Sequence, residues 1–204
     1  KGSISGNFAM AEADLLIVVG SRAVCQADCS GIGYKRAHAV ININGDLADA
    51  LHYNKTVALV GDIGAVAGRL ADKLEALKAN GNKGPWLKAC AAKKAEWSAY
   101  KQKRYACGPL RDEAWQKPVL TQPAAIKLVA DFAKEIGAAK FFDAGDVQAN
   151  GFQIVEDERT GDTFTEAGAS YMGFAASALL GAALAEKPRY GIAFCGDGSF
   201  MMNP

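Results

Sequence analysis

The stretch Tyr190-Gly-Ile-Ala-Phe-Cys-Gly-Asp-Gly-Ser-Phe200 is a short apolar run that ends in a glycine-flanked aspartate. This pattern predicts a strand that delivers Asp197 to a turn, followed by a helix that begins near Ser199. Glycines let the backbone approach a ligand, and the free N–H groups of a helix start attract anions. Because Mg²⁺ is usually bound by one or two carboxylates and substrate phosphates, the stretch indicates a Mg²⁺–diphosphate site. A tight turn closed by an Asp-Gly pair is the alternative interpretation.

Three earlier apolar runs, residues 15–19, 39–43 and 56–60, also end at glycine-containing turns. Such fully apolar runs are typical of buried parallel strands. Alternation with helical periodicity, as in residues 64–77, predicts an α/β fold with two doubly wound parallel-sheet units.

Ligands of such sheets bind beyond the carboxyl ends of the strands. Four polar residues occupy such ends in the first half of the chain: Arg22, Asn44, Asp46 and Asp62. Arg22 is a candidate phosphate contact, and Asn44 or Asp62 a candidate contact for a ribose or an adenine edge. Ordinary helix caps and turns are the alternative, and are slightly favoured for each residue.

The composition is that of a globular protein, with 204 residues of which 50% are hydrophobic. The 23 basic and 22 acidic residues give a net charge of +1, so no global charge favours nucleic acid or an anionic membrane. The longest apolar run, residues 172–185, is too short to span a bilayer and predicts a buried helix. No signal peptide or membrane span is predicted.

The cysteines indicate a reducing, cytoplasmic location. There are five of them, an odd number that argues against a disulfide framework, at positions 25, 29, 90, 107 and 195. Cys25 and Cys29 lie four apart, but neither His38 nor His52 has the spacing of a zinc ligand, so structural thiols are favoured.

A breaker cluster at residues 80–85 precedes a basic stretch, residues 86–105, that is predicted to be helical. Its lysines alternate with Trp97 and Tyr100, a pattern that also occurs in RNA-binding helices. An interdomain helix with a solvated charged face is the favoured interpretation.

The second α/β unit begins at Thr121, which is predicted to cap a helix over residues 124–137. A strand and a glycine turn follow at residues 140–145. Residues 151–162 are polar and are predicted to form a loop, and residues 164–174 lead into the small-residue helix.

Three motifs in order carry a family resemblance: Asp143-Ala-Gly145, Glu166-Ala-Gly-Ala-Ser-Tyr-Met-Gly-Phe174 and Gly196-Asp-Gly-Ser-Phe200. Together they resemble the diphosphate-binding domain of thiamine-diphosphate enzymes of the acetohydroxyacid synthase group. Residues 13–22, 40–44 and 60–63 resemble that group's central domain. Within the group, the run from Glu166 and the Trp-containing connector are most similar to trihydroxycyclohexanedione hydrolase of inositol breakdown.

The resemblance implies a partial Rossmann-like central domain at residues 1–80, a helical connector at 81–120 and a partial thiamine-diphosphate-binding domain at 121–204. The implied cofactors are thiamine diphosphate and Mg²⁺, and FAD is a candidate in the central domain. The family's activating Glu and second Mg²⁺ ligand are expected outside residues 1–204.

The resemblance also implies site residues. Asp197 is the implied metal ligand, and Met172 is the implied catalytic residue, because it supports the cofactor rings. The implied cofactor-binding residues are Gly145, Asp146, Ser170, Met172, Gly196, Gly198 and Ser199. An acid such as Asp146 repels a diphosphate, so backbone contacts are expected there.

The implied function is an enzyme that cleaves or forms a C–C bond next to a carbonyl, with a lean to hydrolytic ring opening of a cyclic 1,2-dione. An acetolactate synthase-type carboligase of 2-oxo acids is the alternative. A non-catalytic nucleotide-binding module is an alternative of another class. A homodimer or homotetramer is expected, because the family's cofactor lies between subunits, and no nucleic-acid or membrane partner is expected.

Overall fold

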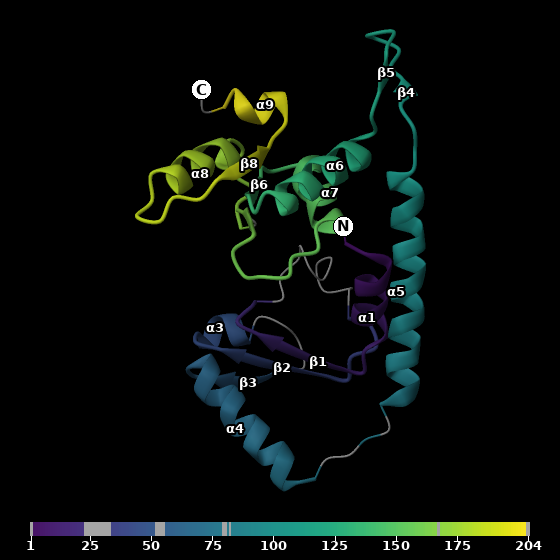
Figure 1. Ribbon diagram of the computed structural model, residues 1–204. Coiled ribbons are helices and arrows are strands. Elements are labelled where there is room, and N and C mark those ends of the chain that lie inside the picture. Colours follow the sequence, from purple (N-terminus) through teal and green to yellow (C-terminus); the bar gives the residue numbers. More distant parts are fainter. Residues whose placement is uncertain are drawn as a thin grey trace. The chain divides into compact units, whose positions relative to one another are not determined.

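The computed structural model describes residues 2–22, 34–51, 56–78, 81, 83–166 and 168–202 (Figure 1). The chain divides into two compact units, Ser3–Trp97 and Ser98–Pro204, the latter with the first two residues. Each unit contains a parallel sheet with helices, which confirms the predicted α/β class. The proposed boundaries at residues 80 and 120 stay predictions. Cys25, Cys29 and His52 lie outside the described ranges, as do Asn80 and Asn82 of the breaker cluster and Ala167 of the motif that begins at Glu166.

The first unit is built on three parallel strands in the order β1-β2-β3 (Figure 1). The elements are α1 (Ile4–Glu12), β1 (Leu15–Val19), β2 (Ala39–Asn44), α3 (Leu47–Ala50), β3 (Thr56–Val60) and α4 (Ile63–Ala76). Their register pairs Leu15 with Ala39 and Val40 with Thr56. The carboxyl ends of the three strands therefore meet at one edge of the sheet.

The edge strand β1 is covered on one face only. Val18 is buried and packs with Tyr34 and Val40, whereas Ile17 and Val19 on the opposite face are each 51% exposed. The prediction of a strand buried on both faces is therefore wrong for β1, and it is also wrong for β3, which has no buried residue. The physical reason is that side chains alternate along a strand, and among the described residues the apolar cluster around β1 lies on the face of Val18.

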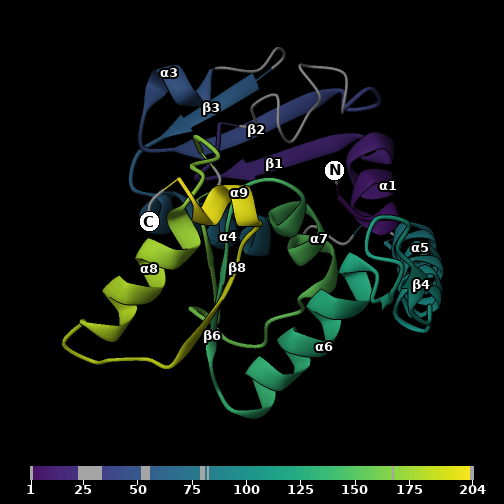
Figure 2. The ribbon, with the colours of Figure 1, turned by 90° about the horizontal axis from the view of Figure 1, so that it is seen from above.

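The second unit has its own parallel sheet in the order β7-β6-β8. Its elements are β4 (Leu110–Arg111), β5 (Pro118–Val119), α6 (Gln122–Glu135), β6 (Ala139–Phe142), α7 (Asp146–Ile154), β7 (Thr163–Thr165), α8 (Phe174–Ala183), β8 (Gly191–Phe194) and α9 (Asp197–Phe200). Figure 2 shows α8 on one side of β6 and β8, with α6 and α7 on the other. This is the doubly wound arrangement that the sequence predicts.

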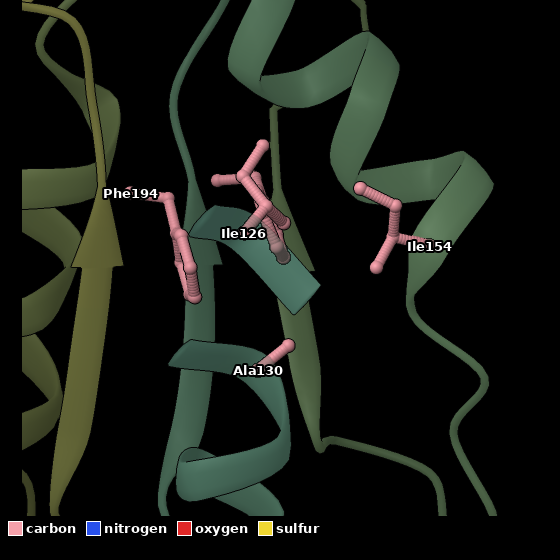
Figure 3. Packing of buried hydrophobic residues seen from close by; sticks show 5 residues of the cluster. Ile126, Ala130, Ile154 and Phe194 are labelled. Carbon is pink, nitrogen blue, oxygen red and sulfur yellow. The ribbon is translucent and has the colours of Figure 1, made fainter. Parts of the chain in front are cut away.

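The core of the second unit lies on both faces of β6. On one face, Phe142 and Phe194 stack with ring centroids 4.4 Å apart, beside Ile126 and Ala130 of α6 and Ile154 of α7 (Figure 3). On the other face, Ala139 and Phe141 pack against Ala175 of α8. Alternation along β6 thus buries both sides of this central strand.

The helices of this unit test three predictions. Thr121 caps α6 as predicted, since its hydroxyl accepts the N–H of Ala124 at 3.4 Å. The predicted loop at residues 151–162 is wrong for residues 151–154, which complete α7 because Gly151 and Ile154 pack inward. The predicted burial of the small-residue helix is wrong for most of α8, where Ala175 alone is buried and Leu180 is 62% exposed.

The predicted basic helix is present as α5 (Gly84–Tyr105). Part of its charge is used within the second unit: Lys101 is buried and pairs with Glu156, and Arg104 donates to Asn150 and Gln153. The basic face is therefore not wholly solvated, contrary to the favoured interpretation. Across the described ranges, no helix combines the length and hydropathy needed to cross a membrane.

Candidate functional site

The predicted site residues of the second unit all follow the carboxyl ends of one sheet. Phe142, Thr165 and Phe194 are the last residues of β6, β7 and β8. The register pairs Phe142 with each of the other two. The segments that begin at Asp143, Glu166 and Cys195 therefore leave the same edge. This is the edge at which open α/β sheets bind their ligands.

Gly145 lies at the start of α7 with a φ of 90°, a conformation that favours glycine. As the N-terminal cap it has no side chain with which to bond the first N–H groups of the helix, and an added Cβ would meet only open space. Asp146 opens the helix and is exposed. The backbone at this point is thus free to bind an anion, whereas the Asp146 carboxylate would repel one.

The Gly-Asp-Gly-Ser motif leaves β8 and enters α9. The helix begins at Asp197 and not near Ser199, so the predicted start is two residues late and Ser199 lies inside the short helix. The Asp197 side chain is exposed, and in the described part of the chain it has no hydrogen-bond partner. Added Cβ atoms at Gly196 and Gly198 would also meet open space. The motif thus presents an unpaired carboxylate between two sterically open positions.

Glu166 is the residue that organises the loop after β7. Its carboxylate accepts N–H groups from Gly168 at 2.7 Å, Ala169 at 3.0 Å and Tyr171 at 3.0 Å. The pKa of Glu166 is lowered because the N–H groups of Ala169 and Tyr171, and then of its other neighbours, stabilise the charged form. Gln148 of α7 donates to the Glu166 carbonyl at 2.9 Å and so ties this loop to α7.

The loop carries the two residues that are predicted to contact the aminopyrimidine. Ser170 has a φ of 55°, the left-handed region that side chains rarely adopt. Such strain is often concentrated at binding sites. The side chain of Met172 is 48% exposed, so within this chain it does not fill a core position.

Asp143 is fully buried and holds the start of α8. Its carboxylate accepts N–H groups from Ala144, from Gly173 and from Ala175, the last two at 3.0 Å. The neighbouring Cys195 has a raised pKa, chiefly because of burial and secondarily because of the Asp143 charge. The sequence marked Asp143 only as part of a motif, and its role as an internal acceptor depends on contacts made 30 residues away.

The polar residues at the sheet edge of the first unit are used locally. Asp46 caps α3 and Asp62 caps α4, through acceptance of backbone N–H groups at 2.7 Å and 2.8 Å. Asn44 donates to the carbonyl of Ser21 and accepts from the N–H of Asp46. The cap and turn interpretation is therefore confirmed for these three residues, while Arg22 is exposed. FAD binding stays a prediction.

The donor set fits a cation held by one protein carboxylate together with a phosphate ligand. Within the described ranges, no three His, Cys, Asp or Glu side chains are grouped closely enough to hold a metal. Among the described residues, Asp197 and Asp146 are both exposed carboxylates at this edge without a side-chain partner, and Asp197 is the one flanked by two glycines. Mg²⁺ typically takes one or two carboxylates and completes its shell with phosphate and water. The described cysteines Cys90, Cys107 and Cys195 are free thiols.

Comparisons with known proteins show a similarity that is confined to a family model at the end of the second unit and to relatives below 30% identity over the whole chain. Residues 143–204 match the family described as "Thiamine pyrophosphate enzyme, C-terminal TPP binding domain". The acetolactate synthase isozyme 2 large subunit of Escherichia coli (strain K12) is 29% identical over 208 residues, which cover 99% of this chain and 33% of the relative. The acetolactate synthase large subunit of Lactococcus lactis is 27% identical over 202 residues, with coverages of 98% and 32%. The chain thus spans about a third of the length of the curated relatives that it matches.

Proposed function

We propose that this chain is part of a thiamine-diphosphate- and Mg²⁺-dependent enzyme of the acetohydroxyacid synthase group, which cleaves or forms a C–C bond next to a carbonyl. One observation carries the proposal: the uncapped start of α7 and the unpaired Asp197 carboxylate leave the same edge of one sheet, inside the segment that matches the cofactor-binding family. Backbone N–H groups and a carboxylate-bound Mg²⁺ are complementary to a diphosphate.

Each site residue has a distinct role in this proposal. Asp197 binds Mg²⁺, and N–H groups at Gly145, Asp146, Gly198 and Ser199 hold the diphosphate. Gly196 leaves room for the close approach of the ligand. The Asp146 side chain is turned to solvent in this role, because its charge opposes that of a phosphate.

The Ser170–Met172 loop is assigned to the other end of the cofactor. When bound, thiamine diphosphate supplies an electron-accepting ring for the cleavage of a C–C bond beside a carbonyl. Peptide groups at Ser170 and Met172 bind the aminopyrimidine edge, and the half-exposed Met172 side chain supports the rings. Met172 is therefore the catalytic residue proposed within this chain.

Retention of the cofactor by the complete protein tests the proposal. The protein is incubated with thiamine diphosphate, with Mg²⁺ or with a chelator, and bound thiamine diphosphate is measured after desalting. We expect retention only with Mg²⁺. Retention of FAD or ADP in place of thiamine diphosphate would instead favour the non-catalytic nucleotide-binding module.

The reaction class has two candidates. The run from Glu166 to Phe174 resembles the hydrolase and underlies the lean to ring opening of a cyclic 1,2-dione. The names of the matched relatives support the alternative, an acetolactate synthase-type reaction of 2-oxo acids. Two assays on the complete enzyme separate them, one for acetolactate and CO₂ from pyruvate and one for loss of the cyclic dione. Acetolactate formation without action on the dione would eliminate the hydrolase.

A homodimer or homotetramer belongs to the same proposal. The exposed apolar side chains of the second unit, such as Leu180 and Leu184 near the end of α8, are consistent with further burial in an assembly. Light scattering by the complete protein checks this expectation, and a monomer that retains full activity would contradict it.

A further inference from the structure

Two carboxylates, each directly after one of two neighbouring strands, accept backbone N–H groups from the segment between Gly168 and Ala175. Glu166, after β7, accepts the N–H groups of Gly168, Ala169 and Tyr171. Asp143, after β6, accepts those of Gly173 and Ala175. Five N–H groups within eight residues are therefore directed at two carboxylates, which accept bonds through both of their oxygens.

These bonds determine where the loop's carbonyl groups point. No described peptide bond is cis, and in a planar trans peptide the N–H and C=O groups point in opposite directions. Because the N–H of Tyr171 is directed at Glu166, the carbonyl of Ser170 points away from Glu166. By the same geometry, the N–H of Gly173 at Asp143 turns the carbonyl of Met172 away from Asp143.

The loop contains one residue, Ser170, whose backbone conformation is unfavourable for a residue with a side chain. Ser170 is left-handed, with a φ of 55°, and Gly173 has a φ of 92°. A non-glycine residue in this region is strained and persists only where surrounding contacts enforce it. Charge-assisted bonds from Glu166 on both sides of Ser170 provide that enforcement. Met172 lies between Tyr171, whose N–H is bonded to Glu166, and Gly173, whose N–H is bonded to Asp143. Among the described residues, the N–H of Met172 itself is not bonded to either carboxylate.

We propose that Glu166 and Asp143 are positioning residues, which turn the peptide groups of Ser170 and Met172 toward the aminopyrimidine end of the cofactor. The inference rests on the proposed function. Neither carboxylate contacts the cofactor in this role, because both are occupied by the protein's own N–H groups. Their effect is to arrange a carbonyl acceptor and an N–H donor in advance, so that binding does not have to order the loop.

Two ligands allow the two ends of the site to be tested separately. Thiamine diphosphate requires the loop as well as the Mg²⁺–diphosphate region, whereas inorganic pyrophosphate requires only the latter. Calorimetry measures the affinity of each for the complete protein with Mg²⁺ present. Glu166→Ala is compared with wild type and with Glu186→Gln, a control at an exposed position of the same unit. Asp143→Asn, which preserves the shape of the buried side chain, tests the bonds from Gly173 and Ala175 to Asp143.

We expect Glu166→Ala to weaken thiamine diphosphate binding about tenfold or more, the scale on which groups that orient a ligand's contacts act. The affinity for pyrophosphate should stay within about twofold of wild type. That is well below a tenfold change in affinity, which corresponds to about 1.4 kcal/mol. Glu166→Gln keeps one acceptor oxygen, so its affinity for thiamine diphosphate should lie between those of wild type and Glu166→Ala.

Two outcomes would overturn the inference while the proposed function stands. One is wild-type affinity of Glu166→Ala for both ligands, and the other is an equal loss for both, which indicates a general structural defect. A wild-type protein that binds neither ligand would instead refute the proposed function, and the inference would fall with it.

Discussion

At the scale of single residues, Asp197 differs from four acids at strand ends that bond backbone N–H groups, namely Asp143, Glu166, Asp46 and Asp62. Of these, Asp46 and Asp62 cap helices. Asp197 is exposed and has no hydrogen-bond partner among the described residues. A carboxylate without a structural task, placed between two glycines, is available for a cation.

Replacement of this side chain should therefore separate binding from stability. We expect Asp197→Ala in the complete protein to lose Mg²⁺-dependent retention of thiamine diphosphate, while the urea midpoint changes little, as is usual for surface substitutions. Calorimetry and urea unfolding measure the two effects. Wild-type cofactor affinity in the variant would remove Asp197 from the proposed site.

Glu166 makes a prediction about pH. Its folded-state pKa lies below the ordinary value of 4.5, because backbone N–H groups stabilise the carboxylate. Its contribution to stability is thus complete above pH 4.5 and is lost as the pH falls through the lowered folded-state pKa. The difference in urea midpoint between wild type and Glu166→Gln should be largest at neutral pH and shrink below pH 4.5. A difference that is constant with pH would contradict this assignment.

At the scale of elements, the contact of α7 with β6 depends on a glycine. An added Cβ at Gly151 would lie 2.4 Å from the ring of Phe142, which is fully buried. The helix approaches the strand this closely only because position 151 has no side chain. The start of α7, where the diphosphate is proposed to bind, is positioned by the same packing.

Gly151→Ala should destabilise the protein by about 1–3 kcal/mol, the usual cost of overpacking a core. Gly181→Ala in α8 is the matched control, since nothing lies within 4 Å of its added Cβ. Removal of a glycine from a helix should stabilise the protein there by roughly 0.5–1 kcal/mol. Urea unfolding measures both variants, and equal effects would show that Phe142 yields to the extra methyl group.

At the scale of the whole molecule, three consecutive acids of the second unit join three of its elements. Glu156 pairs with Lys101 of α5, Asp157 with Lys140 of β6 at 3.1 Å, and Glu158 with Lys134 of α6 at 2.6 Å. Their environments differ: the Lys140 side chain is 6% exposed, whereas that of Lys134 is 63% exposed. The segment between α7 and β7 is thus held by ion pairs that differ in burial, and they should differ in their contribution to stability.

Asp157→Asn should lower the free energy of unfolding by on the order of 3 kcal/mol, because it leaves the buried Lys140 ammonium without its partner. Glu158→Gln should have little effect, since solvent screens an exposed pair. Chemical denaturation of the two variants provides the comparison within one triplet. A larger loss for Glu158→Gln would contradict the ranking by burial.

The sequence by itself determined the features that depend on local chemistry. The apolar runs and glycine turns predicted the strands and their exits, Thr121 predicted a helix cap, and the positions of Asp197 and Gly145 at strand ends followed directly. These patterns succeed because strand alternation, capping and turn conformation are properties of neighbouring residues.

Only the tertiary structure decided what depends on distant contacts. Gly151, predicted to lie in a loop, is part of α7, where it packs closely against the ring of Phe142. One face of β1 is exposed, although the apolar sequence predicted burial. The tertiary structure also made Asp143 an acceptor for Gly173 and Ala175. In each case the outcome depends on which groups from another part of the chain reach the residue. Burial and the pairing of buried polar groups are properties of packing, and local sequence does not specify them.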